Sequence, residues 1–150
     1  MEMPVSAPII FLVSLALNFL FKKMSPYLAA YRRGFDTVVF CAISTGYVGG
    51  IKDGAIYGIL ISIAYYIWRS KQWGHAMFVI PLAGLTGALA GVFNGQPYFQ
   101  IAPIMFGFYH LISALMVTTV YKTMGFRYVT FIAVSFVTTF LLFGIANSYV

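Results

Sequence analysis

The chain has 150 residues, of which 61% are hydrophobic and only 8% are charged. This composition excludes an ordinary soluble domain, in which about a quarter of the residues are charged. The net charge of +6 does not indicate a nucleic-acid partner, because the basic residues stand in short loops beside apolar segments and form no clustered basic face.

Six apolar segments follow one another along the chain, and we expect each to be a membrane helix. They are Pro4–Phe21, Phe35–Gly50, Gly54–Trp68, Ala76–Phe93, Ile101–Tyr121 and Tyr128–Val150. A helix rises about 1.5 Å per residue and the hydrocarbon core is about 30 Å thick, so four of the six are long enough or nearly so. The sequence therefore predicts an all-α integral membrane protein, one compact transmembrane domain of about six helices over residues 1–150.

The second and third segments are short and Gly-rich, and each reaches only about 22 to 24 Å as a helix. Two interpretations remain open. The pair forms two short spans with a tight turn at 51–53, or it forms a re-entrant hairpin whose tip stops inside the bilayer. The first is favoured, because irregular backbone at membrane depth needs protein or a water-filled cavity around it.

The positions of the basic residues predict the orientation. Alternate gaps between the segments hold eight of the nine, namely Lys22, Lys23, Arg32, Arg33, Arg69, Lys71, Lys122 and Arg127, while Lys52 stands alone in the second gap. Basic loops are retained on the cytoplasmic side of a membrane. We therefore expect these three loops in the cytoplasm and both termini outside, with lipid headgroups as the counter-charges.

Small residues spaced four apart give the strongest local pattern. The expected helix-packing residues are Gly46, Gly50, Gly54, Gly58, Ala83, Gly87 and Gly91. Residues at this spacing share one helix face, and the absence of side chains there lets a second backbone approach closely. The rows predict a tightly packed centre, which is either packing within one chain, a contact between copies of the chain, or a mobile, sliding interface.

Two ionisable residues are candidates for an intramembrane polar site. Asp53 lies between the second and third segments, where it is either a turn residue paired with Lys52 or a site for a cation or proton. His110 lies within the fifth segment, where it is either a neutral residue bonded to a neighbouring helix or a functional group.

Known reaction chemistry has little support in the sequence. Cys41 is the only cysteine, so neither an intrachain disulfide nor a cysteine-based metal site is expected. Paired acidic residues at helical spacing, a Ser-His-Asp set and a phosphate-binding loop are absent from the sequence. We expect no enzyme, no metal and no cofactor.

In outline, the chain resembles the substrate-capture subunits of energy-coupling-factor vitamin importers. The shared features are its size, its six short segments and its Gly-rich second and third segments. Those subunits carry small residues spaced four apart on their first helix. In this chain, the residues four positions after Ala7 and Ala16 are the large residues Phe11 and Leu20, so the row of small residues is missing. This departure and the expected outside position of both ends separate the chain from that family, and we do not assign it there.

Two functions fit these observations. The first is a non-catalytic membrane subunit that serves as a scaffold or anchor for a partner protein or a homo-oligomer. The alternative is a component of a transporter or channel, with Asp53 and His110 near the pathway. Broken helices near the bilayer centre are common in transporters, and the short second and third segments are the feature that supports this alternative.

Overall fold

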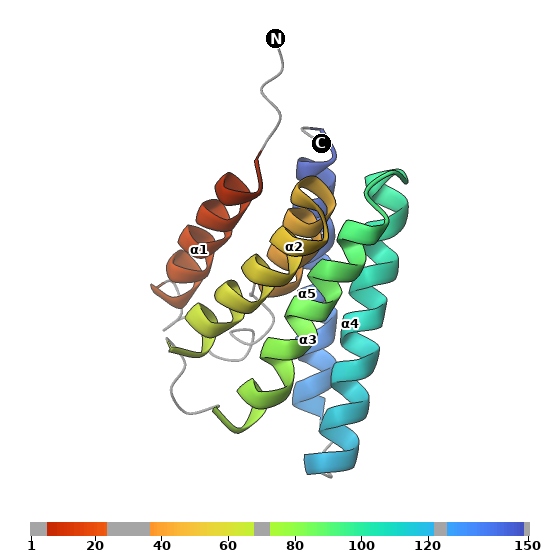
Figure 1. Ribbon diagram of the computed structural model, residues 1–150. Helices are drawn as coiled ribbons and strands as arrows, with labels where there is room; N and C mark the ends of the chain where they lie inside the picture. The colour runs from red at the N-terminus through yellow and green to blue at the C-terminus, as the bar shows by residue number, and fades with distance from the viewer. Residues whose placement is uncertain (1–5, 24–36, 68–72, 122–125, 149–150) are drawn as a thin grey trace.

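The computed structural model describes residues 6–23, 37–67, 73–121 and 126–148. These residues form the helices α1 (Ala7–Lys23), α2 (Val38–Ile67), α3 (Trp73–Val92), α4 (Tyr98–Tyr121) and α5 (Phe126–Ala146) (Figure 1). The predicted all-α class is confirmed. Six separate helices are not supported, because the second and third apolar segments together form the single element α2. The re-entrant hairpin is not supported either.

The helix α2 is broken at Gly50, whose φ of 85° and ψ of −173° are not helical. We call residues 38–49 the first limb and residues 51–67 the second limb. A Cβ added to Gly54 would lie 2.5 Å from the Gly46 Cα atom, and one added to Gly58 would lie 3.2 Å from the Ala42 Cβ atom. In an unbroken helix these pairs would be about 12 and 24 Å apart. The second limb therefore folds back along the first.

Within the described residues, three helices are long and apolar enough to cross a membrane: α2, the part of α3 at His75–Val92 and the part of α4 at Tyr98–Met116. Shorter apolar stretches lie in α1 and α5, at Ala7–Phe21 and Ile132–Ala146. Since α2 doubles back at Gly50, its 30 residues do not form one straight span. These helices support the prediction of a membrane protein.

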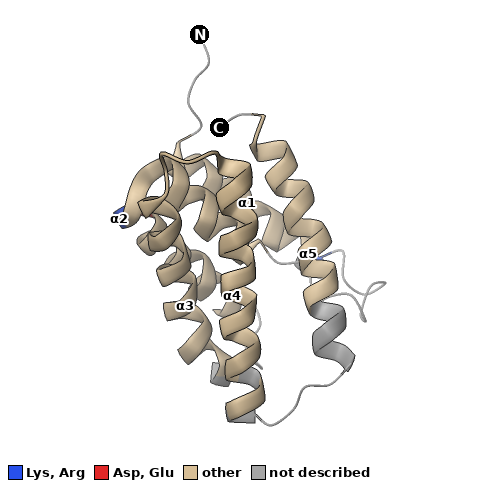
Figure 2. Ribbon diagram, turned by 90° about the vertical axis from the view of Figure 1, so that its right-hand side faces the viewer, with Lys and Arg blue, Asp and Glu red and all other residues tan. Residues whose placement is uncertain are grey.

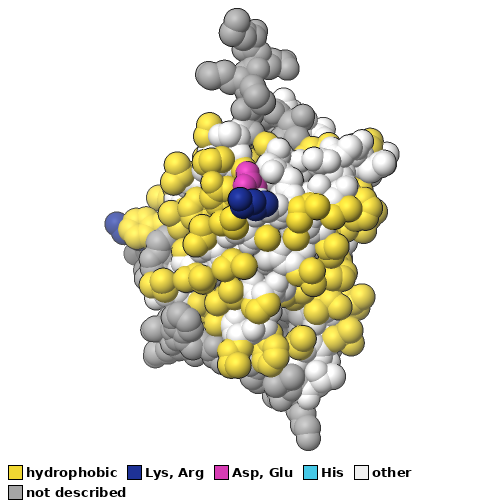
Figure 3. Space-filling view, viewed as in Figure 1, with side chains coloured by type: hydrophobic (Ala, Val, Ile, Leu, Met, Phe, Trp, Pro, Cys, Tyr) yellow, Lys and Arg dark blue, Asp and Glu magenta, His cyan; other side chains and the backbone are white. Residues whose placement is uncertain are grey.

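The outer surface of the bundle is apolar. Large side chains such as Met77, Leu141 and Ile145 are 76%, 65% and 62% exposed, respectively. Hydrophobic side chains are spread widely over the face in Figure 3, and few basic or acidic side chains appear on it. Figure 2 likewise shows helices with very few charged residues. In water such exposure would be unfavourable, whereas a hydrocarbon solvent accepts it.

Most of the described helices begin or end near one of the two ends of the bundle. The start of α2 is an exception. Figure 1 shows that α1 begins and α5 ends at the same end. Towards the opposite end lie the ends of α2 and α4 and the starts of α3 and α5, whereas α1 ends nearer to mid-height. Of the predicted cytoplasmic loops, residues 24–36, 68–72 and 122–125 lie outside the described residues, so the orientation predicted from them stays a prediction.

The first limb of α2 lies at the centre of the bundle, and its residues 38–46 are all buried. An aromatic cluster joins it to α4 and α5: the Phe143 ring lies 5.8 Å from that of Phe40 and 5.7 Å from that of Tyr98. The Tyr98 hydroxyl is 2.6 Å from the Ser44 hydroxyl. The helix α1 contacts both limbs of α2 but, within the described residues, neither α4 nor α5.

Candidate functional site

The two limbs of α2 and the helix α3 meet through their glycines. A Cβ on Gly46 or on Gly54 would overlap the Gly87 carbonyl oxygen, and one on Gly58 would lie 2.6 Å from the Ala83 carbonyl oxygen. A Cβ on Gly87 would in turn lie 2.9 Å from the Ala42 carbonyl oxygen. Backbone therefore packs on backbone, as small residues permit in membrane helices. We call this contact the glycine interlock.

The interlock lies within one chain. Its glycines are buried by α2 and α3 themselves, so these faces are not available to a second copy. At its end, a Cβ on Gly91 would overlap the backbone of Gly50 and Ile51. Gly50 differs from the others, because its own Cβ would meet no atom within 4 Å. Glycine is needed at position 50 because of its positive φ, since residues with a side chain rarely adopt this combination of φ and ψ.

Asp53 lies one turn beyond the break, at the start of the second limb. Its side chain packs over the Cα atom of Gly49, where a Cβ would lie 2.6 Å from the Asp53 Cβ atom. The side chain is partly buried, and Lys52 beside it is exposed. Both residues are described, and the structure contains no ion pair between them, so the turn role does not depend on the expected pairing with Lys52.

His110 is buried in the interface of α4 and α5, where it is 5% exposed. Its Nε2 atom lies 3.4 Å from the Ser135 hydroxyl of α5, and its ring lies 4.2 Å from that of Phe106. Asp53 has different neighbours, near the break in α2. The structure therefore does not bring the two candidate polar residues into one site.

The start of α2 is a polar feature that the sequence analysis did not single out. The Thr37 backbone N–H donates to the Asn18 Oδ1 atom over 3.1 Å, and the Thr37 hydroxyl donates to the Ser14 carbonyl oxygen over 2.8 Å. Asn18 thus caps α2 from another helix. A possible signal was the spacing of Ser14 and Asn18, two polar residues four apart on one face of an apolar helix.

This start lies inside the bundle and not at its end. Asn18 is five residues before the end of α1 at Lys23, which is about 8 Å along the helix. Ser14, Thr37 and Asn18 are at most 6% exposed. Hence the chain places the amino end of a helix in the low-dielectric interior, where its partial positive charge is poorly screened.

The described residues hold no group of three or more His, Cys, Asp or Glu side chains that could bind a metal ion. What they hold is a rigid glycine interlock, a buried histidine and an interior helix start. No protein-family model matches the chain, and neither a curated protein nor a solved structure shows significant similarity to it.

Proposed function

We propose that the chain is a non-catalytic, multi-pass membrane subunit that anchors a partner protein or a second copy of itself in the bilayer. The observation that carries this proposal is the glycine interlock. Close backbone packing of α2 on α3 makes the centre rigid, and densely packed interiors do not deform continuously. Such a centre suits a fixed framework better than a pathway that opens and closes.

The apolar exterior gives further support, because it offers a wide surface to lipid or to another membrane helix. With the interlock faces occupied inside the chain, the partner would use the outer faces of the bundle. The proposed topology has six passes, counting the limbs of α2 as two, with both termini outside and the basic loops in the cytoplasm. An even number of passes agrees with α1 beginning and α5 ending at one end (Figure 1).

The second candidate function is that of a transporter or channel component, and one observation favours it. A helix that begins inside the bundle, as α2 does at Thr37, is a feature of transporters, whose broken helices direct their ends at a solute. His110 would then contribute from α4. Asp53 supports this alternative less, because its side chain packs at the turn of α2.

Two measurements on the purified protein separate these functions. Light scattering in a mild detergent gives the mass of the particle, which we expect to exceed the 16.6 kDa of one chain through self-association or a co-purified partner. Liposomes containing the protein should show no more proton or potassium flux than empty liposomes. A single chain without a partner would contradict the anchor function, and saturable flux would establish the transport alternative.

A further inference from the structure

Two buried polar side chains beside the start of α2 keep atoms without a hydrogen-bond partner. These atoms are the Asn18 Nδ2 atom and the Ser14 hydroxyl oxygen, in residues that are 6% and 0% exposed, and the Ser14 hydroxyl has only the weak donor of the Cys41 thiol beside it. The Asn18 amide has a fixed orientation, because its Oδ1 atom must accept from the Thr37 N–H. Its NH2 group therefore remains a pure donor. An unsatisfied donor in a membrane interior is unfavourable, so a ligand that accepts a hydrogen bond from it gains affinity.

The start of the helix adds donors of the same kind. The first intrahelical bond runs from the Cys41 N–H to the Thr37 carbonyl oxygen over 2.8 Å, so the N–H groups of Val38, Val39 and Phe40 precede it. These three residues are at most 7% exposed. Such leading N–H groups lack intrahelical partners and form the positive end of the helix dipole. The site therefore favours a group with acceptor oxygens.

A carboxyl group meets these demands. It has two acceptor oxygens, and when protonated it also donates, which the Ser14 hydroxyl can accept. A doubly charged phosphate fits less well, because its recognition relies on Arg or Lys side chains. Among the residues whose side chains the structure describes, the only basic ones are Lys23, Lys52 and the two histidines, and none of them contacts Ser14 or Asn18.

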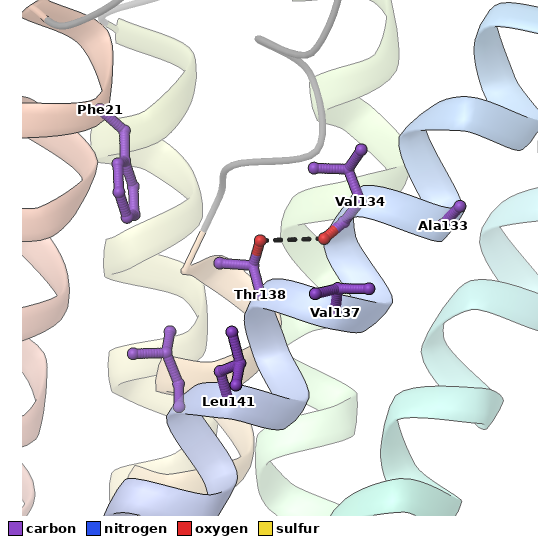
Figure 4. A pocket seen from close by; sticks show the side chains of 7 residues that line it. Phe21, Ala133, Val134, Val137, Thr138 and Leu141 are labelled. Atoms are coloured by element: carbon purple, nitrogen blue, oxygen red, sulfur yellow. Dashed lines mark hydrogen bonds between the residues drawn. The ribbon is translucent and has the colours of Figure 1, made fainter.

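An apolar hollow of about 630 Å³ lies between the two helices that flank this start. Figure 4 shows Phe21 of α1 on one side and Val134, Val137 and Leu141 of α5 on the other. Among the described residues of its lining, the only hydroxyl is that of Thr138, which donates to the Val134 carbonyl oxygen over 2.9 Å. The described part of the lining thus offers a hydrocarbon-like surface.

The residue of α1 that lines the hollow, Phe21, lies about one turn beyond Asn18, which is not itself in the lining. Ser14, Asn18 and Phe21 are spaced by four and three residues, which places them on one face of the helix. The same face therefore carries the two polar groups and then the aromatic wall of the hollow. At the other wall, Phe143 of α5 follows directly after Leu142 of the lining and packs on Phe40, near the start of α2.

We propose that this chain binds a carboxylic acid with a long hydrocarbon chain, a fatty acid, between α1 and α5. The carboxyl group accepts from the Asn18 amide and the first N–H groups of α2, beside the Ser14 hydroxyl. The hydrocarbon chain lies in the apolar hollow and enters from the bilayer. The lateral opening lets the ligand exchange with lipid without crossing water.

The test uses the full chain in liposomes and a photoactivatable diazirine analogue of palmitate. We expect saturable labelling of α1 or α5 that excess palmitate blocks and excess hexadecanol, which lacks the carboxyl group, does not. The variant Asn18→Asp keeps the oxygen that caps α2 but replaces the donor by a second oxygen. In protein that remains folded, it should raise the half-saturating concentration at least ~tenfold, as loss of a hydrogen bond to the carboxyl group predicts. Asn147→Asp, at an exposed position after α5, is the matched control.

A second pair of variants decides the matter if Asn18→Asp does not fold. Val137→Trp fills the hollow from a residue that is 59% exposed, whereas Leu111→Trp adds the same bulk to α4 at a residue that is 60% exposed. Only the first should weaken labelling. No saturable labelling, equal blocking by hexadecanol, or equal labelling of Val137→Trp and Leu111→Trp would each overturn the proposal, as would unchanged labelling of a folded Asn18→Asp protein.

Discussion

Gly54 and Gly87 are reciprocally in contact: a Cβ added to either one would overlap the carbonyl oxygen of the other. Neither residue can therefore be enlarged without moving two backbones apart. The relationship gives a local reason for both glycines and links the start of the second limb of α2 to the carboxyl-terminal half of α3.

Replacing Gly87 by Leu should prevent normal folding, because the side chain has no space between α2 and α3. We expect destabilisation by at least about 3 kcal/mol, the upper range for overpacked cores. The melting temperature and the detergent-soluble yield measure this effect. Gly107→Leu is the matched control, since Gly107 is an exposed residue of α4 whose Cβ would meet nothing within 4 Å. Equal stability of the two variants would contradict the close packing.

Replacing Gly50 by Ala should destabilise the protein for a different reason. The position has free space but a φ of 85° and a ψ of −173°, a combination open almost only to glycine, and we expect a cost of about 1 to 3 kcal/mol. Asn, which tolerates ordinary left-handed turns, should not rescue it. Gly95→Ala, in an exposed turn with free space and no positive φ, should leave the melting temperature unchanged.

Replacing Tyr98 by Phe should remove the buried bond to Ser44 and lower stability by about 1 kcal/mol. Tyr47→Phe removes a hydroxyl that donates to the Gln96 carbonyl oxygen in an exposed setting, so its effect should be smaller. Ser44→Ala combined with Tyr98→Phe tests the pair, because bonded residues give non-additive changes in thermal unfolding. Strict additivity would show that the two hydroxyls act independently.

Asp53→Asn and His110→Gln should both retain the particle mass and partner binding of the unmodified protein. Each substitution keeps size and hydrogen-bonding capacity and removes only the ability to titrate, which an anchor does not need. A transporter that moves a proton or cation through either residue would lose flux while remaining folded, because an amide cannot take part in a charge cycle. Flux measurements beside mass measurements distinguish these results.

The orientation can be checked by cysteine labelling in a Cys41→Ser background. A membrane-impermeant maleimide applied from outside should label Ser148→Cys near the carboxyl end. It should reach Arg32→Cys, Arg69→Cys or Lys122→Cys only after the membrane is opened, because basic loops are retained in the cytoplasm. The reverse pattern would invert the topology.

The sequence predicted the helical class and the places of α1, α3, α4 and α5 to within a few residues, because long apolar runs report burial in lipid directly. It did not predict that α2 begins at Thr37 inside the bundle. Hydropathy measures how apolar a segment is but carries no information on the depth at which a helix starts. Asn18 can bond to a neighbouring helix or to a nearby carbonyl, and the sequence alone does not indicate that it accepts from Thr37, nineteen residues later in the chain.

The glycine rows show the same limit. Their spacing indicated close approach of helices, but the partner of each row is a tertiary property. The contacts between Gly46, Gly54 and Gly87 depend on the reversal of the chain at Gly50, which the sequence marked only as one of several glycines.

The position of Gly87 between the limbs of α2 has a consequence for the order in which the chain matures during synthesis. Gly87 contacts Gly54 of the second limb and Ala42 of the first, so the hairpin of α2 has no complete wall until α3 has left the ribosome and entered the bilayer. Until then the glycine faces of the hairpin are exposed to lipid. Lipid chains do not pack into the narrow groove along these glycines as closely as the backbone of α3 does. The packing of the α2 hairpin therefore becomes complete only when α3 has been synthesised as far as Gly91, which packs on Gly50 and Ile51.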